Sequence, residues 1–194
     1  MVRPREFDRD AALDQATRVF WAKGFASTST DDLLSAMNIG RQSMYNAFGD
    51  KRSLYMEVVR TYQQKMLAIH LTRLNGEVSA LSGIRALLWG LAPSNAAERA
   101  LGCLGVGAVG EFGTTDEELL QLAHSVSRSL SKRIAERIAE GQAQREIAAD
   151  IDRNDAAAFI LTTMSGLQLA ARAGATMQQL HKQAEFVVSR LQAI

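Results

Sequence analysis

Five polar residues between positions 41 and 51 have side chains that proteins commonly use to bind nucleic acids. They are Arg41, Gln42, Ser43, Asn46 and Lys51. Arginine and glutamine can pair with base edges in the major groove, and serine, asparagine and lysine commonly contact phosphate oxygens. Met44, Tyr45 and Phe48 have the spacing that packs one face of a helix inward. The pattern predicts a short helix, beginning at about residue 41, that presents a polar face.

A second short helix is expected to support the first. Thr28 and Asp31 have the spacing of a capping box, and Leu33 and Met37 follow at helical spacing. The run 38–40 contains Asn and Gly, which easily leave the helical conformation, so it predicts a tight turn. Two short helices across such a turn are typical of a helix-turn-helix, here at about residues 29–48.

Residues 8–62 resemble the DNA-binding domain of TetR-family transcriptional regulators. The resemblance is carried by Gly24-Phe25, Thr28 to Thr30, Met37 to Gly40, Tyr45, Phe48 and Lys51. Two positions depart from the family pattern: Asn38 replaces a usual Gly, and Gly40 replaces a usual Ser or Thr cap. The later helices and the pair Gly102-Cys103 resemble the AcrR-like branch. The resemblance implies a DNA-binding regulator that generally dimerises; a generic helical hairpin in an enzyme is the alternative.

Roles can be assigned within the expected DNA-binding face. Arg41 and Gln42 are predicted to read bases, whereas the phosphate contacts are predicted to be Ser43, Tyr45, Asn46 and Lys51. Thr28 is counted with the DNA contacts as well. Net charge does not decide the question, because residues 1–65 hold ten Lys or Arg and eight Asp or Glu, a net charge of only +2. Placement is more informative, since basic residues occur in the N-terminal arm, in the recognition helix and at the start of the next helix, where phosphates would lie: Arg3, Arg5, Arg41, Lys51 and Arg52.

Composition and motifs favour a cytoplasmic binding protein over an enzyme. The chain has 194 residues, one cysteine, a charged N-terminus and no apolar run near the ~20 residues of a membrane span. His70, His124 and His181 are widely separated, and no metal-binding motif occurs. Residues 105–110 spell GxGxxG, but no strand is predicted before them, so a dinucleotide site is not expected. We expect no catalytic residue, cofactor, metal or membrane.

The remaining periodicity predicts an all-α fold. The first helix is expected to end at Gly24. Later helices are expected at about 51–74, 84–92, 116–141, 155–174 and 177–194, with a loop after Pro93. We place a helix-turn-helix DNA-binding domain at residues 6–66 and a helical ligand-binding and dimerisation domain at 67–194. The helix 51–74 would belong to both.

The last two expected helices favour a homodimer. Residues 155–174 are apolar nearly all round, and residues 177–194 form a heptad seam, so one chain is not expected to cover both. The predicted interface residues are Phe159, Leu167, Ala171, Leu180, Val187 and Leu191. Packing of this seam inside the monomer is the alternative.

A small-molecule pocket is expected among the middle helices, where apolar and polar side chains can converge. Its candidate residues are Met66, His70, Trp89, Cys103, Glu111, Phe112, His124, Met164 and Gln168. Each has a simpler interpretation as a core or surface residue, and Cys103 could be a redox sensor or a small buried hydrophobe.

The sequence therefore predicts a homodimeric regulator of double-stranded operator DNA, released by an unknown small-molecule effector and expected to be a repressor. An activator or ligand-independent regulator of the same fold is one alternative. Another is a helical small-molecule-binding or catalytic protein that has lost DNA binding.

Overall fold

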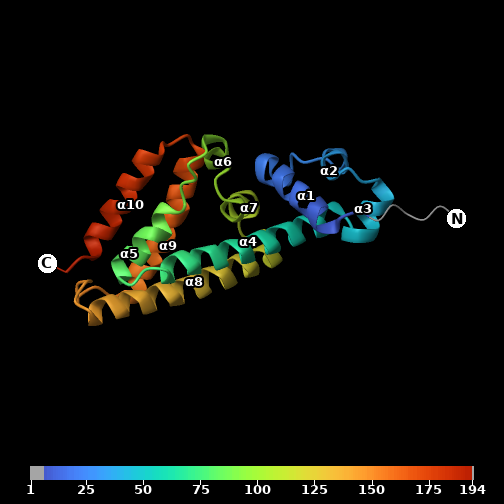
Figure 1. Cartoon of the computed structure of the whole chain (residues 1–194). Coiled ribbons are helices and arrows are strands. Elements are labelled where there is room, and N and C mark those ends of the chain that lie inside the picture. The colour runs from blue at the N-terminus through green and yellow to red at the C-terminus, as the bar shows by residue number, and fades with distance from the viewer. Residues whose placement is uncertain (1–6, 194) are drawn as a thin grey trace.

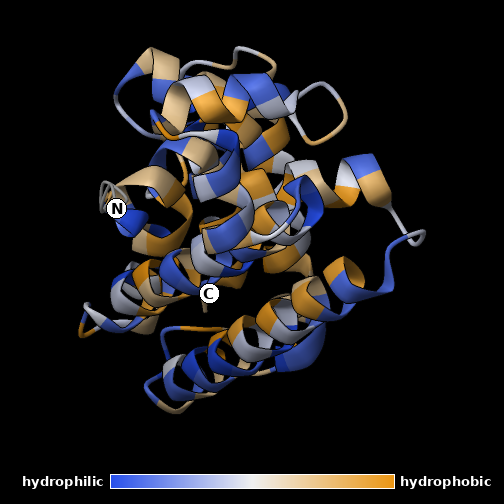
Figure 2. Ribbon diagram, turned by 90° about the vertical axis from the view of Figure 1, so that its right-hand side faces the viewer, coloured by the Kyte–Doolittle hydropathy of each residue, from blue (hydrophilic) through white to orange (hydrophobic). Residues whose placement is uncertain are grey.

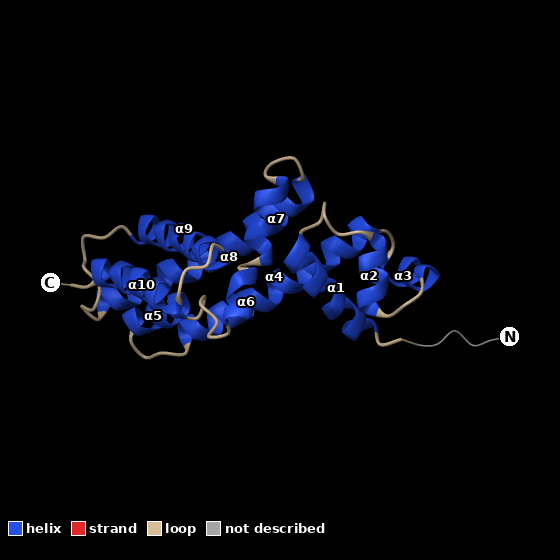
Figure 3. Cartoon of the chain, turned by 90° about the horizontal axis from the view of Figure 1, so that it is seen from above, coloured by secondary structure: helices blue, strands red, loops and turns tan. Residues whose placement is uncertain are grey.

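The computed structural model describes residues 7–193, and these residues form ten helices and no strand (Figures 1 and 3). The helices are α1 (Arg9–Lys23), α2 (Thr30–Met37), α3 (Arg41–Phe48), α4 (Lys51–Asn75), α5 (Ala80–Trp89), α6 (Ala96–Leu101), α7 (Leu104–Phe112), α8 (Glu117–Ala143), α9 (Arg153–Arg172) and α10 (Met177–Leu191). The all-α prediction is confirmed. The long helices α4 and α8 lie side by side, and they join the two halves of the molecule (Figure 1).

The helix boundaries follow local capping chemistry. Asp8, Asp50 and Asp116 each precede a helix and accept a hydrogen bond from a backbone N–H of its first turn. The predicted start of the fifth helix at Ile84 was wrong, because Ser79 caps the helix and it begins at Ala80. Part of the predicted loop after Pro93 was also wrong, since α6 forms there.

Two hydrophobic cores divide the molecule. The first is formed by α1–α3 and the N-terminal half of α4, and it includes Phe20, Met44 and Val58. The second is formed by α5, α8, α9, α10 and the C-terminal end of α4. Figure 2 shows the hydrophobic residues gathered between the helices. The predicted domain boundary at residue 66 falls inside α4, between these cores, and stays a prediction.

Helix α7 belongs to the first core although it lies far along the chain. Its Leu104 and Ala108 are buried there together with Leu119 of α8. The GxGxxG residues lie on this helix rather than at a strand-to-helix turn, and a Cβ on Gly105 would approach Gln63 Nε2 to 3.2 Å. The glycine therefore permits close packing of α7 on α4.

Among residues 7–193, no helix is both long enough and apolar enough to span a membrane.

Candidate nucleic-acid interface and adjacent cleft

Helices α2 and α3 form the predicted helix-turn-helix. Asn38 adopts the left-handed conformation, with φ of 53°, and Gly40 is the N-cap of α3 without a side-chain hydrogen bond. Both outcomes agree with the turn chemistry expected from the sequence. The capping box differs by one position from the prediction, because Ser29 and Asp32 form it. Lys23 and Ser29 hold the pKa of the Asp32 carboxyl well below its usual range through hydrogen bonds.

Thr28 does not belong to the exposed face, so its placement among the DNA contacts was wrong. Its side chain is buried, and its hydroxyl donates a hydrogen bond to the carbonyl oxygen of Gly24 at 2.6 Å. Thr28 therefore fixes the end of α1 against the start of α2.

The polar face of α3 is open to solvent. Met44 and Phe48 are buried beneath it as expected, but Tyr45 is 45% exposed, so its predicted inward packing was wrong. Arg41 forms an exposed ion pair with Asp31 of α2, with 2.7 Å between Nη2 and Oδ1. Gln42 Nε2 donates to Asn46 Oδ1 at 2.9 Å. These contacts align the side chains along one face. An exposed ion pair contributes at most about 1 kcal/mol, so Arg41 can exchange Asp31 for another partner.

The start of α4 borders this face. Lys51 Nζ lies 4.2 Å from the centroid of the Phe25 ring, a cation–π contact that positions its charge. Arg52 was expected to contact phosphate, but its guanidinium pairs with Asp116, the N-cap of α8, at 2.8 Å. Arg3 and Arg5 lie outside the described residues.

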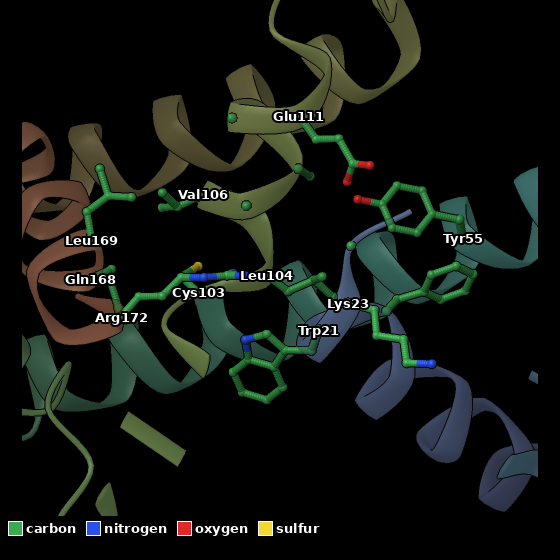
Figure 4. A pocket seen from close by; sticks show the side chains of 15 residues that line it. Trp21, Lys23, Tyr55, Cys103, Leu104, Val106, Glu111, Gln168, Leu169 and Arg172 are labelled. Carbon is green, nitrogen blue, oxygen red and sulfur yellow. The ribbon is translucent and has the colours of Figure 1, made fainter. Parts of the chain in front are cut away.

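A cleft of about 280 Å³ lies between α1, α4, α7 and α9, next to the DNA-binding helices (Figure 4). Three predicted pocket residues line it: Cys103, Glu111 and Gln168. Sequence reasoning missed Trp21 and Arg172, which also line the cleft. They come from helices at opposite ends of the chain, and only the fold brings them together.

The other six predicted pocket residues lie outside this cleft. Trp89 stacks on His181 of α10, with 4.6 Å between ring centroids, and is partly exposed. Phe112 packs against Phe25 in the first core, and Met164 is buried in the second. Met66 and His70 are half-buried on α4, and His124 is exposed on α8. The prediction that these six residues line one pocket with the other three is therefore wrong for this cleft.

Glu111 connects the cleft to the segment that precedes the helix-turn-helix. Its carboxylate accepts hydrogen bonds from the backbone N–H groups of Phe25, at 2.9 Å, and Ala26, at 2.6 Å. Tyr55 lies beside it, and burial together with the negative charge of Glu111 raises the pKa of Tyr55 to about 12. One carboxylate thus joins α7 to the segment between α1 and α2.

Five of the six predicted dimer residues are buried inside one chain. They are Leu167, Ala171, Leu180, Val187 and Leu191. Their assignment to a surface was wrong, because the apolar seam of α10 packs on α5 and α9. Phe159 remains exposed, and so do Leu169 of α9 and Phe186 of α10. Ile194 lies outside the described residues.

In the described part of the chain, no group of three or more His, Cys, Asp or Glu side chains could hold a metal ion.

Two family models match the chain. The model described as "Bacterial regulatory proteins, tetR family" matches residues 12–58, and the one described as "Tetracyclin repressor-like, C-terminal domain" matches residues 80–187.

Individual relatives match over nearly the whole chain. The HTH-type transcriptional regulator YezE of Bacillus subtilis is 29% identical over 98% of this chain and 100% of its own length. The HTH-type transcriptional repressor ComR of Escherichia coli is 28% identical over 92% of this chain and 86% of its own. A solved structure of the TetR family transcriptional regulator CifR, a cysteine mutant complexed with 26-base-pair operator DNA, is 29% identical. It covers 97% of this chain and 99% of its own, with a TM-score of 0.81.

Proposed function

Because the chain belongs to the TetR family of bacterial regulatory proteins and is a DNA-binding transcriptional regulator, we propose that it acts as a homodimeric repressor. A small-molecule effector releases it from a near-palindromic operator. The two parts of the chain, 6–66 and 67–194, divide DNA binding from effector binding and dimerisation. We propose that it acts in the cytoplasm, where a bacterial operator is found.

One observation carries this proposal: the cleft and the DNA-binding helices share the Glu111 contact. A ligand in the cleft touches α7, and α7 holds Phe25 and Ala26 at the end of α1. Ligand binding can release DNA only if its affinity differs between the two arrangements of the DNA-binding helices. The cleft is lined by both α7 and α1, so its shape depends on how these helices lie relative to each other, which supports such a difference in affinity.

The dimer surface is proposed on the outer faces of α9 and α10. Phe159 and Phe186 are 55% and 58% exposed. Large exposed apolar side chains on adjacent helices favour a partner surface. A two-fold dimer presents two copies of α3 to two half-sites, which is why the operator should be nearly palindromic.

An activator or ligand-independent regulator would share this fold. The effect of ligand on operator binding, whether it weakens, strengthens or leaves it unchanged, distinguishes these alternatives from the proposed repressor.

The experiment starts from an operator selected in vitro from random duplex DNA with the full-length protein. Selection of an inverted repeat, bound by two chains with strong salt dependence, supports the proposal. Selection of no sequence would favour the remaining alternative, a small-molecule-binding or catalytic protein that has lost DNA binding.

A further inference from the structure

The cleft between α1, α4, α7 and α9 has polar groups at two ends and apolar walls between them. Cys103, Gln168 and Arg172 lie toward α9, whereas Glu111 lies toward Tyr55 and α1 (Figure 4). The apolar walls include Phe20, Leu104, Val106 and Leu169. Its volume of about 280 Å³ is near the lower end of the range for small-molecule sites, about 300–1,000 Å³. The cleft therefore suits a small ligand.

The α9 end supplies hydrogen-bond donors that the protein leaves unused. Arg172 makes no ion pair with any residue in the range 7–193, and its Nη1 makes only a long hydrogen bond, 3.5 Å, to the carbonyl oxygen of Leu101. Trp21 Nε1 is buried and has no hydrogen-bond partner. The indole ring of Trp21 lines the cleft, but its Nε1 has almost no accessible surface, so the guanidinium of Arg172 is the donor that a ligand in the cleft can reach.

The opposite end does not require a cationic ligand. Both oxygens of Glu111 already accept hydrogen bonds from the backbone, from Phe25 and Ala26. The negative charge is therefore stabilised within the protein, whereas Arg172 is exposed and its guanidinium has no anionic partner among residues 7–193. A planar carboxylate also matches the forked donors of a guanidinium. These differences favour an anionic ligand over a cationic one.

We propose that this cleft is the effector site and that it binds a small apolar molecule carrying a carboxylate. The carboxylate pairs with Arg172 near the ring of Trp21, while the apolar part lies against Leu104 and Val106 of α7. The assignment as effector site rests on the function proposed above. Because Glu111 is on the same helix, occupancy of the cleft acts on the contact that holds Phe25.

Binding can be followed through Trp21 itself. The chain has two tryptophans, and Trp89→Phe leaves Trp21 as the only one. Three probes of nearly equal size are compared by fluorescence titration: benzoate, benzamide and benzylamine. We expect saturable binding of benzoate at millimolar or lower concentration, with Kd at least tenfold below that of the neutral and cationic probes.

Arg172 provides the decisive variant. Arg172→Gln should raise the Kd for benzoate at least tenfold and leave benzamide unchanged, whereas Arg172→Lys should retain part of the preference for the anion. Arg128→Gln removes the same charge from an exposed position on α8 and should change nothing. Circular dichroism checks that each variant is folded. Absent or non-saturable benzoate binding, equal binding to folded Arg172→Gln, or tighter binding of benzylamine would overturn the proposal.

A separate measurement distinguishes this site from the proposed function. Fluorescence anisotropy with the selected operator, with and without saturating benzoate, reports whether occupancy of the cleft weakens DNA binding. Arg172-dependent binding of benzoate with unchanged operator affinity would support the carboxylate site and reject its role as an effector site. Absence of Arg172-dependent binding would overturn the site itself, whatever happens to the operator.

Discussion

The carboxylate of Glu111 on α7 accepts a hydrogen bond from the backbone N–H of Phe25 at 2.9 Å, although 86 positions separate the two residues. Lys51 Nζ lies over the ring of the same Phe25, 4.2 Å from its centroid. A single aromatic residue therefore lies between a carboxylate at the cleft and a cation at the proposed DNA-binding face. We therefore expect a shift of α7 to change the support of Phe25 and, through its ring, the position of Lys51.

Removal of this carboxylate should loosen the segment after α1. In Glu111→Ala, the amide protons of Phe25 and Ala26 should exchange about tenfold faster than in the wild type, since each tenfold corresponds to about 1.4 kcal/mol, within the range lost with hydrogen bonds to a charged group. Amide hydrogen exchange by NMR measures this directly. Glu77→Ala, which removes an exposed carboxylate from the segment between α4 and α5, is the control. Unchanged protection of both amides in Glu111→Ala would contradict the contact.

Variants at the DNA-binding face should separate effects on base preference from effects on overall DNA affinity. Gln42→Ala should relax the preference at particular base pairs by about 1–3 kcal/mol, because a paired contact to a base edge is lost. Lys51→Ala should weaken all duplexes alike and lower the salt slope by about one, because a phosphate contact is lost. Binding isotherms at several salt concentrations on matched and altered operators test both. A Lys51 variant with altered base preference alone would reverse the assignment.

The ion pair within this face leads to a further expectation. Asp31 holds Arg41 in the free protein, and its carboxylate would lie close to the DNA phosphates. Asp31→Asn should therefore tighten binding to DNA of any sequence, by up to tenfold at low salt, and the gain should shrink as salt is raised. Binding to unrelated duplex DNA measures it. Weaker binding by this variant would show that the pair is needed to orient Arg41.

Dimerisation should depend on exposed rather than buried residues of the last helices. Phe159→Asp and Phe186→Asp should dissociate the dimer and weaken operator binding together, since a charge would be placed in an apolar interface. Val78→Asp, at a residue that is 95% exposed between α4 and α5, is the matched control and should stay dimeric. Sedimentation velocity distinguishes them. Leu167→Asp should instead unfold the chain, because Leu167 is in the second core.

The sequence alone predicted the local elements well, because their signals are local. The turn at Asn38, the N-cap at Gly40 and the long helix from Lys51 follow from backbone preferences and periodicity within a few residues. The placement of side chains depended on partners elsewhere in the chain. Thr28 looks like an exposed cap in sequence, but its hydroxyl donates to Gly24 O and its side chain is buried.

The lining of the cleft could not be predicted from the sequence for the same reason. Trp21 and Arg172 are 151 positions apart, and no spacing rule relates them. An apolar seam such as that of α10 also has one periodicity whether it packs within a chain or between chains. Leu180 and Val187 therefore carried no signal that distinguished a core from an interface, and only the burial of both residues in one chain decides it.

The half-buried His70 should make stability depend on pH. Burial, with a smaller contribution from the charge of Arg73, lowers the pKa of His70 to about 4, from 6.5 in the unfolded chain. Above pH 6.5 the imidazole is neutral in both states. Between about pH 6.5 and 4 the unfolded state binds more protons, so the free energy of unfolding falls as pH falls, by up to about 3 kcal/mol for this shift.

His70→Gln removes this titration and isolates its contribution from that of the carboxylates. The difference in unfolding free energy between wild type and His70→Gln, measured by urea denaturation, should change across this window and stay constant above pH 7. His124→Gln replaces an exposed histidine on α8 and should follow the wild-type profile. Parallel pH profiles for the wild type and His70→Gln would mean that His70 is protonated equally easily in the folded and unfolded states, contrary to its burial on α4.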